Sequence, residues 1–272
     1  MTGRGEGELE GGFGEVAADP CDTSGLFSEA GGVGERASRK RDVDAGSQDD
    51  FFDPPVRGVP AGVGAGRPAA QFLGAGHMFA GDATTAVPLA REALALARQI
   101  GAPALIATSL LAVGATVAGT DPGQARACLR ESRELSTALG HQSARDLLWA
   151  TGIAFLVGDQ ATTLELGRLA IHDLQWGGDR LRMGGVLHFI AGALAATRPD
   201  AAAIILGAAD AHVAAPAPVS QPMALIVGAA LGEERARELR TRGAGMGWDQ
   251  ALAYTLTQAT QALTELQTQT QP

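Results

Sequence analysis

The fold is decided by the stretch Arg91-Glu-Ala-Leu-Ala-Leu-Ala-Arg-Gln-Ile-Gly101, because it returns 39 residues later as Arg130-Glu-Ser-Arg-Glu-Leu-Ser-Thr-Ala-Leu-Gly140. Both copies begin with an Arg-Glu pair, carry a leucine at the sixth position and end in glycine. Self-similarity at a fixed period of this length is typical of stacked helix pairs, in which no pair can bury its apolar face alone. We therefore predict a helical-repeat protein.

Turn signals recur with nearly the same period. Asp82, Asp121 and Asp159 are spaced by 39 and 38 residues, and Asp200 follows more loosely. Between them apolar residues recur at helical steps of three and four, and no segment alternates with the period of a strand. We expect an all-α chain, an α-solenoid of about four tetratricopeptide-like helix pairs with a helical C-terminal cap. The expected helices lie at about 82–100, 104–118, 124–139, 143–157, 161–175, 180–196, 200–214, 223–231, 232–242 and 248–266.

Residues 1–76 have a different composition, with 13 acidic and 7 basic residues among glycine, serine and proline. Apolar residues follow no period there, and Phe51-Phe52 belongs to the only apolar cluster. Such a segment cannot bury enough apolar surface to offset its ordering entropy, so we expect a disordered tail. The expected organisation is this tail over 1–76, a helical-repeat domain over 77–266 with its cap from about 216, and a frayed C-terminus over 267–272.

The composition argues against several classes of protein. The formal net charge of −9 is unlike that of a general nucleic-acid or membrane binder, since both need clustered positive charge. Lys40 is the only lysine and lies in no Gly-Lys-Ser/Thr turn, so we expect neither a P-loop nor a Schiff base. Cys21 and Cys128 suggest no disulfide framework, and no apolar leader follows Met1, so we expect a cytoplasmic protein. We expect the uncharged run from Gln99 to Thr120 to be a buried repeat helix, because proline and three glycines interrupt it.

Candidate site residues are few. No His-Glu-x-x-His or His-x-x-x-His motif is present, and Asp210 and His212, two residues apart on a helix, diverge by about 200°. We expect no catalytic residue, no metal site and no cofactor. His172 and Trp176, near the end of one return helix, are the candidate groove contacts. Two interpretations stay open for Trp176: a recognition contact, or a side chain that fills the gap where two glycines let the chain turn.

The C-terminal third carries a family resemblance in three phrases. They are Leu206-Gly-Ala-Ala209, Leu231-Gly-Glu-Glu-Arg235 and Gly243-Ala-Gly-Met246. They resemble the end of the repeat region in large actinobacterial signal-transduction ATPases, which include LuxR-type regulators and proteins associated with adenylate or guanylate cyclase domains. The resemblance implies a tetratricopeptide-like sensor or interaction region. Because this sequence shows no Walker motif, cyclase segment or helix-turn-helix, it implies none of the family's ATPase, cyclase or DNA-binding residues.

These observations together favour a binding role. We expect a non-catalytic helical-repeat module that binds a protein or a small effector in signalling or transcription control, without direct contact with nucleic acid or membrane. Two alternatives stay open. One is a small helical enzyme that uses the scattered histidines and aspartates, and the other is a truncated, non-functional remnant of a larger regulator.

Overall fold

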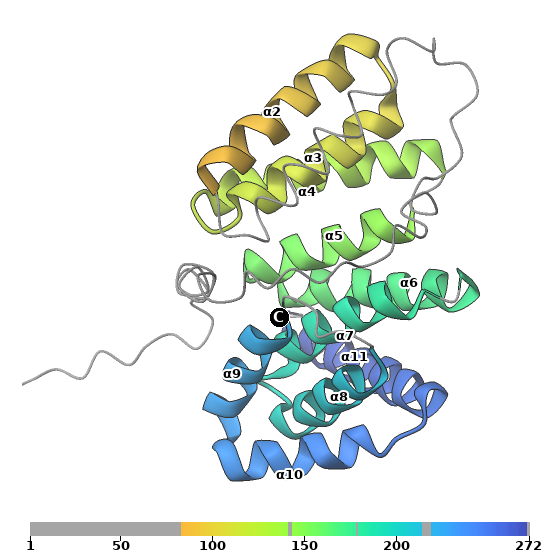
Figure 1. The fold of residues 1–272 in the computed structure, drawn as a ribbon. Coiled ribbons are helices and arrows are strands. Elements are labelled where there is room, and N and C mark those ends of the chain that lie inside the picture. The colour runs from red at the N-terminus through yellow and green to blue at the C-terminus, as the bar shows by residue number, and fades with distance from the viewer. Residues whose placement is uncertain (1–82, 141–142, 178, 214–218, 271–272) are drawn as a thin grey trace, which may run out of the picture.

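The structure, a computed structural model, describes residues 83–140, 143–177, 179–213 and 219–270. These residues form ten helices and no strand (Figure 1), which confirms the predicted all-α class. The tail predicted over 1–76 and the turn at Asp82 lie outside the described residues. The helices are α2 (Ala83–Ile100), α3 (Pro103–Val117), α4 (Pro122–Leu139), α5 (Ala144–Leu156), α6 (Gln160–Gly177), α7 (Arg180–Leu194), α8 (Pro199–His212), α9 (Ser220–Leu231), α10 (Glu233–Ala244) and α11 (Trp248–Thr270).

The two copies of the repeated stretch end in the same way. Gly101 after α2 and Gly140 after α4 both have φ = 68°, in the left-handed region that glycine tolerates best. The Gly101 N–H donates to the carbonyls of Ala97 and Arg98, and the Gly140 N–H donates to the equivalent pair one repeat later. Each glycine thus satisfies carbonyls at the end of its helix and turns the chain toward the next one.

Aspartates begin several of the helices, as the turn signals predict. The Asp121 carboxylate accepts from the N–H of Gln124 at 2.8 Å at the start of α4. The Asp159 carboxylate accepts from the N–H of Thr162 at 3.0 Å in the first turn of α6. Asp200 differs, because it lies inside the first turn of α8, behind Pro199, and does not cap that helix. An N-terminal cap of this kind stabilises a helix by about 1 kcal/mol.

Helix packing follows the order of the chain. Each helix from α2 to α10 packs against the next, and α3, α5, α7 and α9 also pack against one another in series. The pairs succeed one another along the length of the molecule, from α2 to α10 (Figure 1). A large apolar core runs from Leu111 in α3 to Ala262 in α11, and a smaller one joins α2, α3 and α4. The largest fully buried side chains are mostly leucine and isoleucine, among them Leu110, Leu164, Ile171, Leu187, Ile190 and Leu194.

Helices α8 and α10 approach each other more closely than side chains would allow. A Cβ atom placed on Gly207 of α8 would lie 2.0 Å from the carbonyl oxygen of Arg240. A Cβ atom placed on Gly243 of α10 would lie 1.9 Å from the carbonyl oxygen of Ile204. Since both obstacles are backbone atoms of regular helices, no side chain can rotate away to make room. The two glycines therefore set the distance between these helices.

The last helix departs from the order of the others. α11 packs against α6, α7 and α8, although it follows α10 in the sequence. Arg198, in the turn before α8, fixes it with bonds to Gln258 at 2.9 Å and Gln261 at 2.8 Å and an ion pair with Glu265 at 2.5 Å. The sequence predicts this helix to end near residue 266, and in the structure it runs to Thr270.

Candidate functional site

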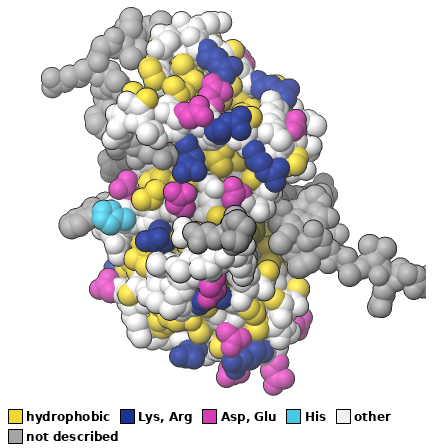
Figure 2. Space-filling view, turned by 180° about the vertical axis from the view of Figure 1, so that it is seen from behind, with side chains coloured by type: hydrophobic (Ala, Val, Ile, Leu, Met, Phe, Trp, Pro, Cys, Tyr) yellow, Lys and Arg dark blue, Asp and Glu magenta, His cyan; other side chains and the backbone are white. Residues whose placement is uncertain are grey.

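A surface hollow of about 710 Å³ lies between α4 and α6, beside the end of α5. α4 packs on α3 and α5, whereas α6 packs on α5 and α7, so α4 and α6 do not form a closely packed pair. Leu129 and Val157 form an apolar floor that is almost fully buried. Charged side chains stand around this floor, most of them from α4. In Figure 2 arginine and acidic side chains are interspersed over the upper half of the molecule, which contains α2 to α5.

Three arginines of α4 form the rim of this hollow, which we call the arginine hollow. Arg126, Arg130 and Arg133 are spaced by four and three residues, so they share one face of the helix. Arg126 donates a hydrogen bond to the carbonyl of Val157, at the end of α5. Arg133 forms an ion pair with Glu165 of α6 at 3.4 Å. Arg130 is exposed and forms no ion pair or hydrogen bond with another described residue.

Two carboxylates also line the arginine hollow, and one of them is already engaged. Asp159 accepts the capping hydrogen bond at the start of α6, whereas Glu134 is exposed at the rim. Among the described residues, three carboxylates thus accompany the three guanidinium groups: Glu134, Asp159 and the Glu165 that pairs with Arg133. Because one arginine has no described partner and another uses only part of its five N–H donors, the hollow can accept a further carboxylate or phosphate.

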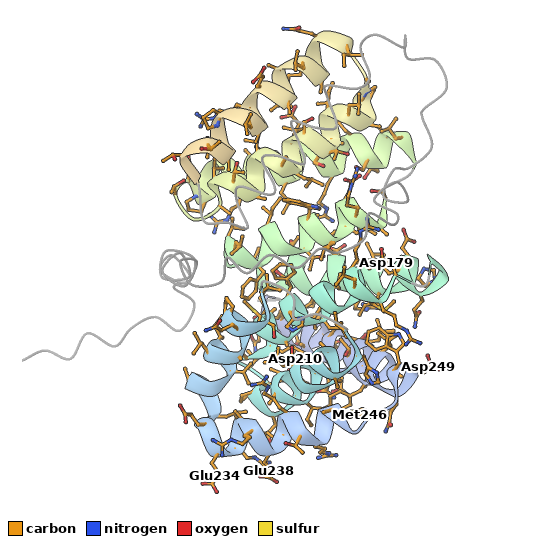
Figure 3. All side chains as sticks on the ribbon, viewed as in Figure 1. Asp179, Asp210, Glu234, Glu238, Met246 and Asp249 are labelled. Carbon is orange, nitrogen blue, oxygen red and sulfur yellow. The ribbon has the colours of Figure 1, made fainter. Side chains whose placement is uncertain are left out.

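A second hollow, of about 470 Å³, lies at the junction of α9 and α10. Glu233, Glu234 and Glu238 line it, and Figure 3 shows the last two at the outer edge of α10. Its single arginine, Arg235, pairs with Asp200 and Glu238, each at 2.9 Å. This hollow is acidic and therefore unsuited to an anionic ligand.

The residues predicted as groove contacts lie elsewhere on α6. His172 is exposed and stands ten residues beyond Thr162 of the arginine hollow, which corresponds to about 15 Å along a helix. The backbone of Trp176 belongs to the last turn of α6, but its side chain lies outside the described residues. His172 is not among the residues that line the arginine hollow. Their role in recognition stays a prediction.

A partly buried polar cluster joins the four helices α7 to α10. The His188 ring of α7 is fully buried, and its Nε2 lies 2.9 Å from Oδ1 of Asp210 in α8. Asp210, labelled in Figure 3, also accepts from the Ser220 hydroxyl of α9 at 2.6 Å and from Arg240 of α10 at 2.8 Å. The other ring nitrogen of His188 lies 2.6 Å from the carbonyl oxygen of Gly184. One aspartate thus links α7, α8, α9 and α10.

The hydrogen bonds decide the charge state of Asp210. Burial alone would raise its pKa, but the hydrogen bonds from His188, Ser220 and Arg240 outweigh burial and lower the pKa from 3.8 to about 2. Asp210 is therefore ionised at neutral pH. Both ring nitrogens of His188 face acceptor oxygens, those of Gly184 and Asp210.

This cluster contains serine, histidine and aspartate but not the geometry of a nucleophile and its base. In a hydrolase the serine hydroxyl donates to the histidine, which the aspartate holds from behind. Here Ser220 donates to Asp210 directly, and both ring nitrogens of His188 are occupied by acceptors. A ring that is fully buried and committed at both nitrogens cannot take a proton from a substrate. The cluster is suited to holding helices together.

His212, the last residue of α8, is also bound to protein atoms. His212 Nε2 lies 2.7 Å from the carbonyl oxygen of Met246, and its ring packs edge-on against Trp248 at 5.3 Å. The guanidinium of Arg180 lies over the same indole, 5.9 Å from the ring centre. Within the described residues, no three His, Cys, Asp or Glu side chains gather in a way that could hold a metal ion. Burial raises the pKa of the Cys128 thiol, which makes it a poor nucleophile.

Sequence reasoning missed both the hollow and the cluster for the same reason. Asp210 pairs with residues 22 positions before and 30 positions after it, and such distances leave no local motif. The arginine spacing on α4 is visible in the sequence, but Glu131 and Glu134 are interleaved with Arg130 and Arg133, a pattern typical of a solvated helix face. Only the packing shows that Glu131 forms an ion pair with Arg98 of α2 at 3.0 Å. Glu131 is therefore engaged with α2 and does not pair with Arg130.

The chain matches no protein-family model, no curated protein and no solved structure. Among the described residues, no helix combines the length and the apolar character needed to cross a bilayer.

Proposed function

We propose that this chain is a non-catalytic helical-repeat module that binds a partner protein or small effector through carboxylate groups held in the arginine hollow. The observation that carries the proposal is Arg130, an exposed cation above an apolar floor with no described partner. Arg126 and Arg133 stand on either side of it, so a ligand carboxylate could contact more than one guanidinium. In this proposal the module belongs to a signalling or transcription-control system, as the family resemblance implies.

We further propose that the helix pairs form an α-solenoid of the tetratricopeptide-like kind. Side chains of alternate helices meet at a nearly constant sequence spacing. Arg98 of α2 pairs with Glu131 of α4, and Arg133 of α4 pairs with Glu165 of α6, at spacings of 33 and 32 residues. Equivalent positions of neighbouring repeats are adjacent in a solenoid, which accounts for such a series. α11 would then be the last helix of the cap predicted from about residue 216, and it covers α6, α7 and α8 out of order.

A solenoid explains why the hollow would be ready to bind. Neighbouring repeats fix each other's spacing, so the gap between α4 and α6 exists before any ligand arrives. A preformed site spends little free energy on ordering, and the ligand alone is restricted when it binds. The enzyme alternative receives no support from the one cluster that contains catalytic residue types, because its histidine is buried and bonded at both nitrogens.

The proposal is tested by titrating the full chain into two labelled peptides and measuring fluorescence anisotropy. One peptide is a short run of glutamate and phenylalanine, and in the other lysine replaces glutamate. We expect the acidic peptide alone to bind, and Arg130→Glu to weaken it at least tenfold, since a charged hydrogen bond contributes about 1.5–3 kcal/mol. Arg237→Glu is the matched control, because Arg237 is an exposed arginine of α10 far from the hollow in sequence. Equal binding by both variants would contradict the proposal.

A further inference from the structure

The strongest candidate for an occupant of the arginine hollow lies in the chain itself. Residues 49–53 read Asp-Asp-Phe-Phe-Asp and contain the only pair of adjacent aromatic residues in the sequence. They lie outside the described residues. Resting on the function proposed above, we propose that the segment Asp49–Asp53 binds in the arginine hollow and competes there with an acidic partner.

Charge complementarity is the first argument. The segment carries three carboxylates in five residues and no basic residue. In the arginine hollow, Arg130 has no described partner and Arg126 has donors left after its bond to Val157. Two carboxylates of the segment can therefore pair with two guanidinium groups that lie one helical turn apart. The acidic hollow between α9 and α10 would repel the same segment.

The aromatic pair supplies the second argument. Charge alone would favour any acidic run, but the arginine hollow also offers apolar surface, chiefly the exposed stems of Arg126 and Arg130 beside Leu129 and Val157. Arginine side chains also offer the flat faces of their guanidinium groups and their aliphatic stems to aromatic rings. Phe51 and Phe52 can therefore stack on the exposed arginines of the rim while the neighbouring aspartates pair with the same arginines. The other acidic stretches within the first 48 residues lack this combination, because no two aromatic residues are adjacent there.

The connection is long enough. Asp53 is 30 residues from Ala83, and 30 residues can span up to about 100 Å. α2 runs beside α4 in the same direction, because Arg91 contacts Gln124 and Arg98 contacts Glu131. The start of α2 therefore lies near the start of α4, at the end of the hollow that holds Arg126. Docking needs only a small fraction of the available length.

A tethered segment competes strongly even when its own affinity is modest. A segment joined by a linker of this order has an effective concentration of about 1 mM at a site within reach. If the same peptide binds in trans with a dissociation constant of about 0.1 mM, the tethered copy lowers the apparent affinity of a competitor about tenfold. The tail would thereby set a threshold that a partner must exceed.

The experiment compares full-length proteins only. The probe is a labelled peptide with the sequence of residues 47–56. The fraction of probe bound is measured by fluorescence anisotropy at two protein concentrations, and an apparent dissociation constant is calculated at each. One protein is the wild type. A second carries D49N, D50N, D53N, F51A and F52A together, and this tail variant is also combined with Arg130→Glu or with the control Arg237→Glu. Because all these positions lie in the tail or on exposed helix faces, circular dichroism should be unchanged.

We expect the tail variant to bind the probe about tenfold more tightly than the wild type, at both concentrations. Arg130→Glu should remove that gain and Arg237→Glu should leave it. Equal affinities of wild type and tail variant, both weakened by Arg130→Glu, would overturn the tail proposal and leave the proposed function intact. A difference that grows with protein concentration would also overturn it, since the segment would then bind a second copy. Absence of binding by every protein, or binding insensitive to Arg130→Glu, would overturn both proposals.

Discussion

The crossing of α8 and α10 allows a sharp test of the packing. In Gly207→Ala the new methyl group would lie 2.0 Å from the carbonyl oxygen of Arg240 and 2.6 Å from its Cα and carbonyl carbon. Contacts of this kind below 3.0 Å are essentially never observed. α10 would therefore have to retreat by about 1 Å at this point, because the obstacle is backbone and cannot rotate away.

The expected loss has two parts. Overpacking of a close helix contact costs about 1–3 kcal/mol, of which the helix propensity of alanine returns about 1 kcal/mol. The retreat of α10 also stretches the 2.8 Å bond between Arg240 and Asp210, and a charged hydrogen bond contributes about 1.5–3 kcal/mol. We expect a net loss of about 3 kcal/mol. In a domain of this size that lowers Tm by about 6–12 °C.

Urea unfolding followed by far-UV circular dichroism measures this loss directly. Gly228→Ala is the matched control, since Gly228 also lies inside a helix but a methyl group placed on it would meet no atom within 4 Å. That variant should be as stable as the wild type or more stable by up to about 1 kcal/mol. If Gly207→Ala unfolds within about 0.5 kcal/mol of Gly228→Ala, the close crossing of α8 and α10 does not exist in solution.

Three further predictions concern Asp210, Ser132 and Arg198. Folding lowers the pKa of Asp210 from 3.8 to about 2, so the ionised carboxylate stabilises the fold by roughly 2 kcal/mol above pH 4. This stabilisation is lost as the pH falls from about 4 to 2. Asp210→Asn should lose about 3 kcal/mol at pH 7, since the amide removes the charge and keeps only one acceptor oxygen, so either His188 or Arg240 loses its acceptor. Urea titrations across that pH range should show a flatter profile than for the wild type. Ser132→Ala should stabilise the protein by about 1 kcal/mol in the same assay, because the buried Ser132 hydroxyl has no hydrogen-bond partner among the described residues; a loss of stability would point to an unrecognised partner. Arg198→Ala should speed amide exchange in α11 while leaving α3 unchanged, and equal exchange in both proteins would show that this arginine does not hold the cap.

Much of the fold could be predicted from the sequence because its signals are local. The left-handed glycine after α4 needs only its own backbone geometry, and the aspartate at the start of α6 needs only the next three residues. Both are written in adjacent positions. The helix boundaries accordingly agree with prediction to within a few residues, and the largest extension is the last turn of α11.

The placement of α11 and the candidate site could not be predicted in the same way. α11 follows α10 in sequence but packs against α6, and nothing in its amphipathic pattern names that partner. The polar cluster depends on Asp210 meeting His188 across two helices, whereas the sequence offered only the nearby His212, which turns to Trp248 instead. Such pairings arise from tertiary packing, and a single sequence carries no periodic signal for them.

Hydrogen–deuterium exchange of the full chain, with and without a saturating acidic peptide of glutamate and phenylalanine, tests the central claim most directly. The binding account predicts slower exchange in α4 and α6, the two helices that border the arginine hollow, and little change in α9 and α10. Slower exchange at α9 and α10, or no change in α4 and α6 at saturation, would contradict it.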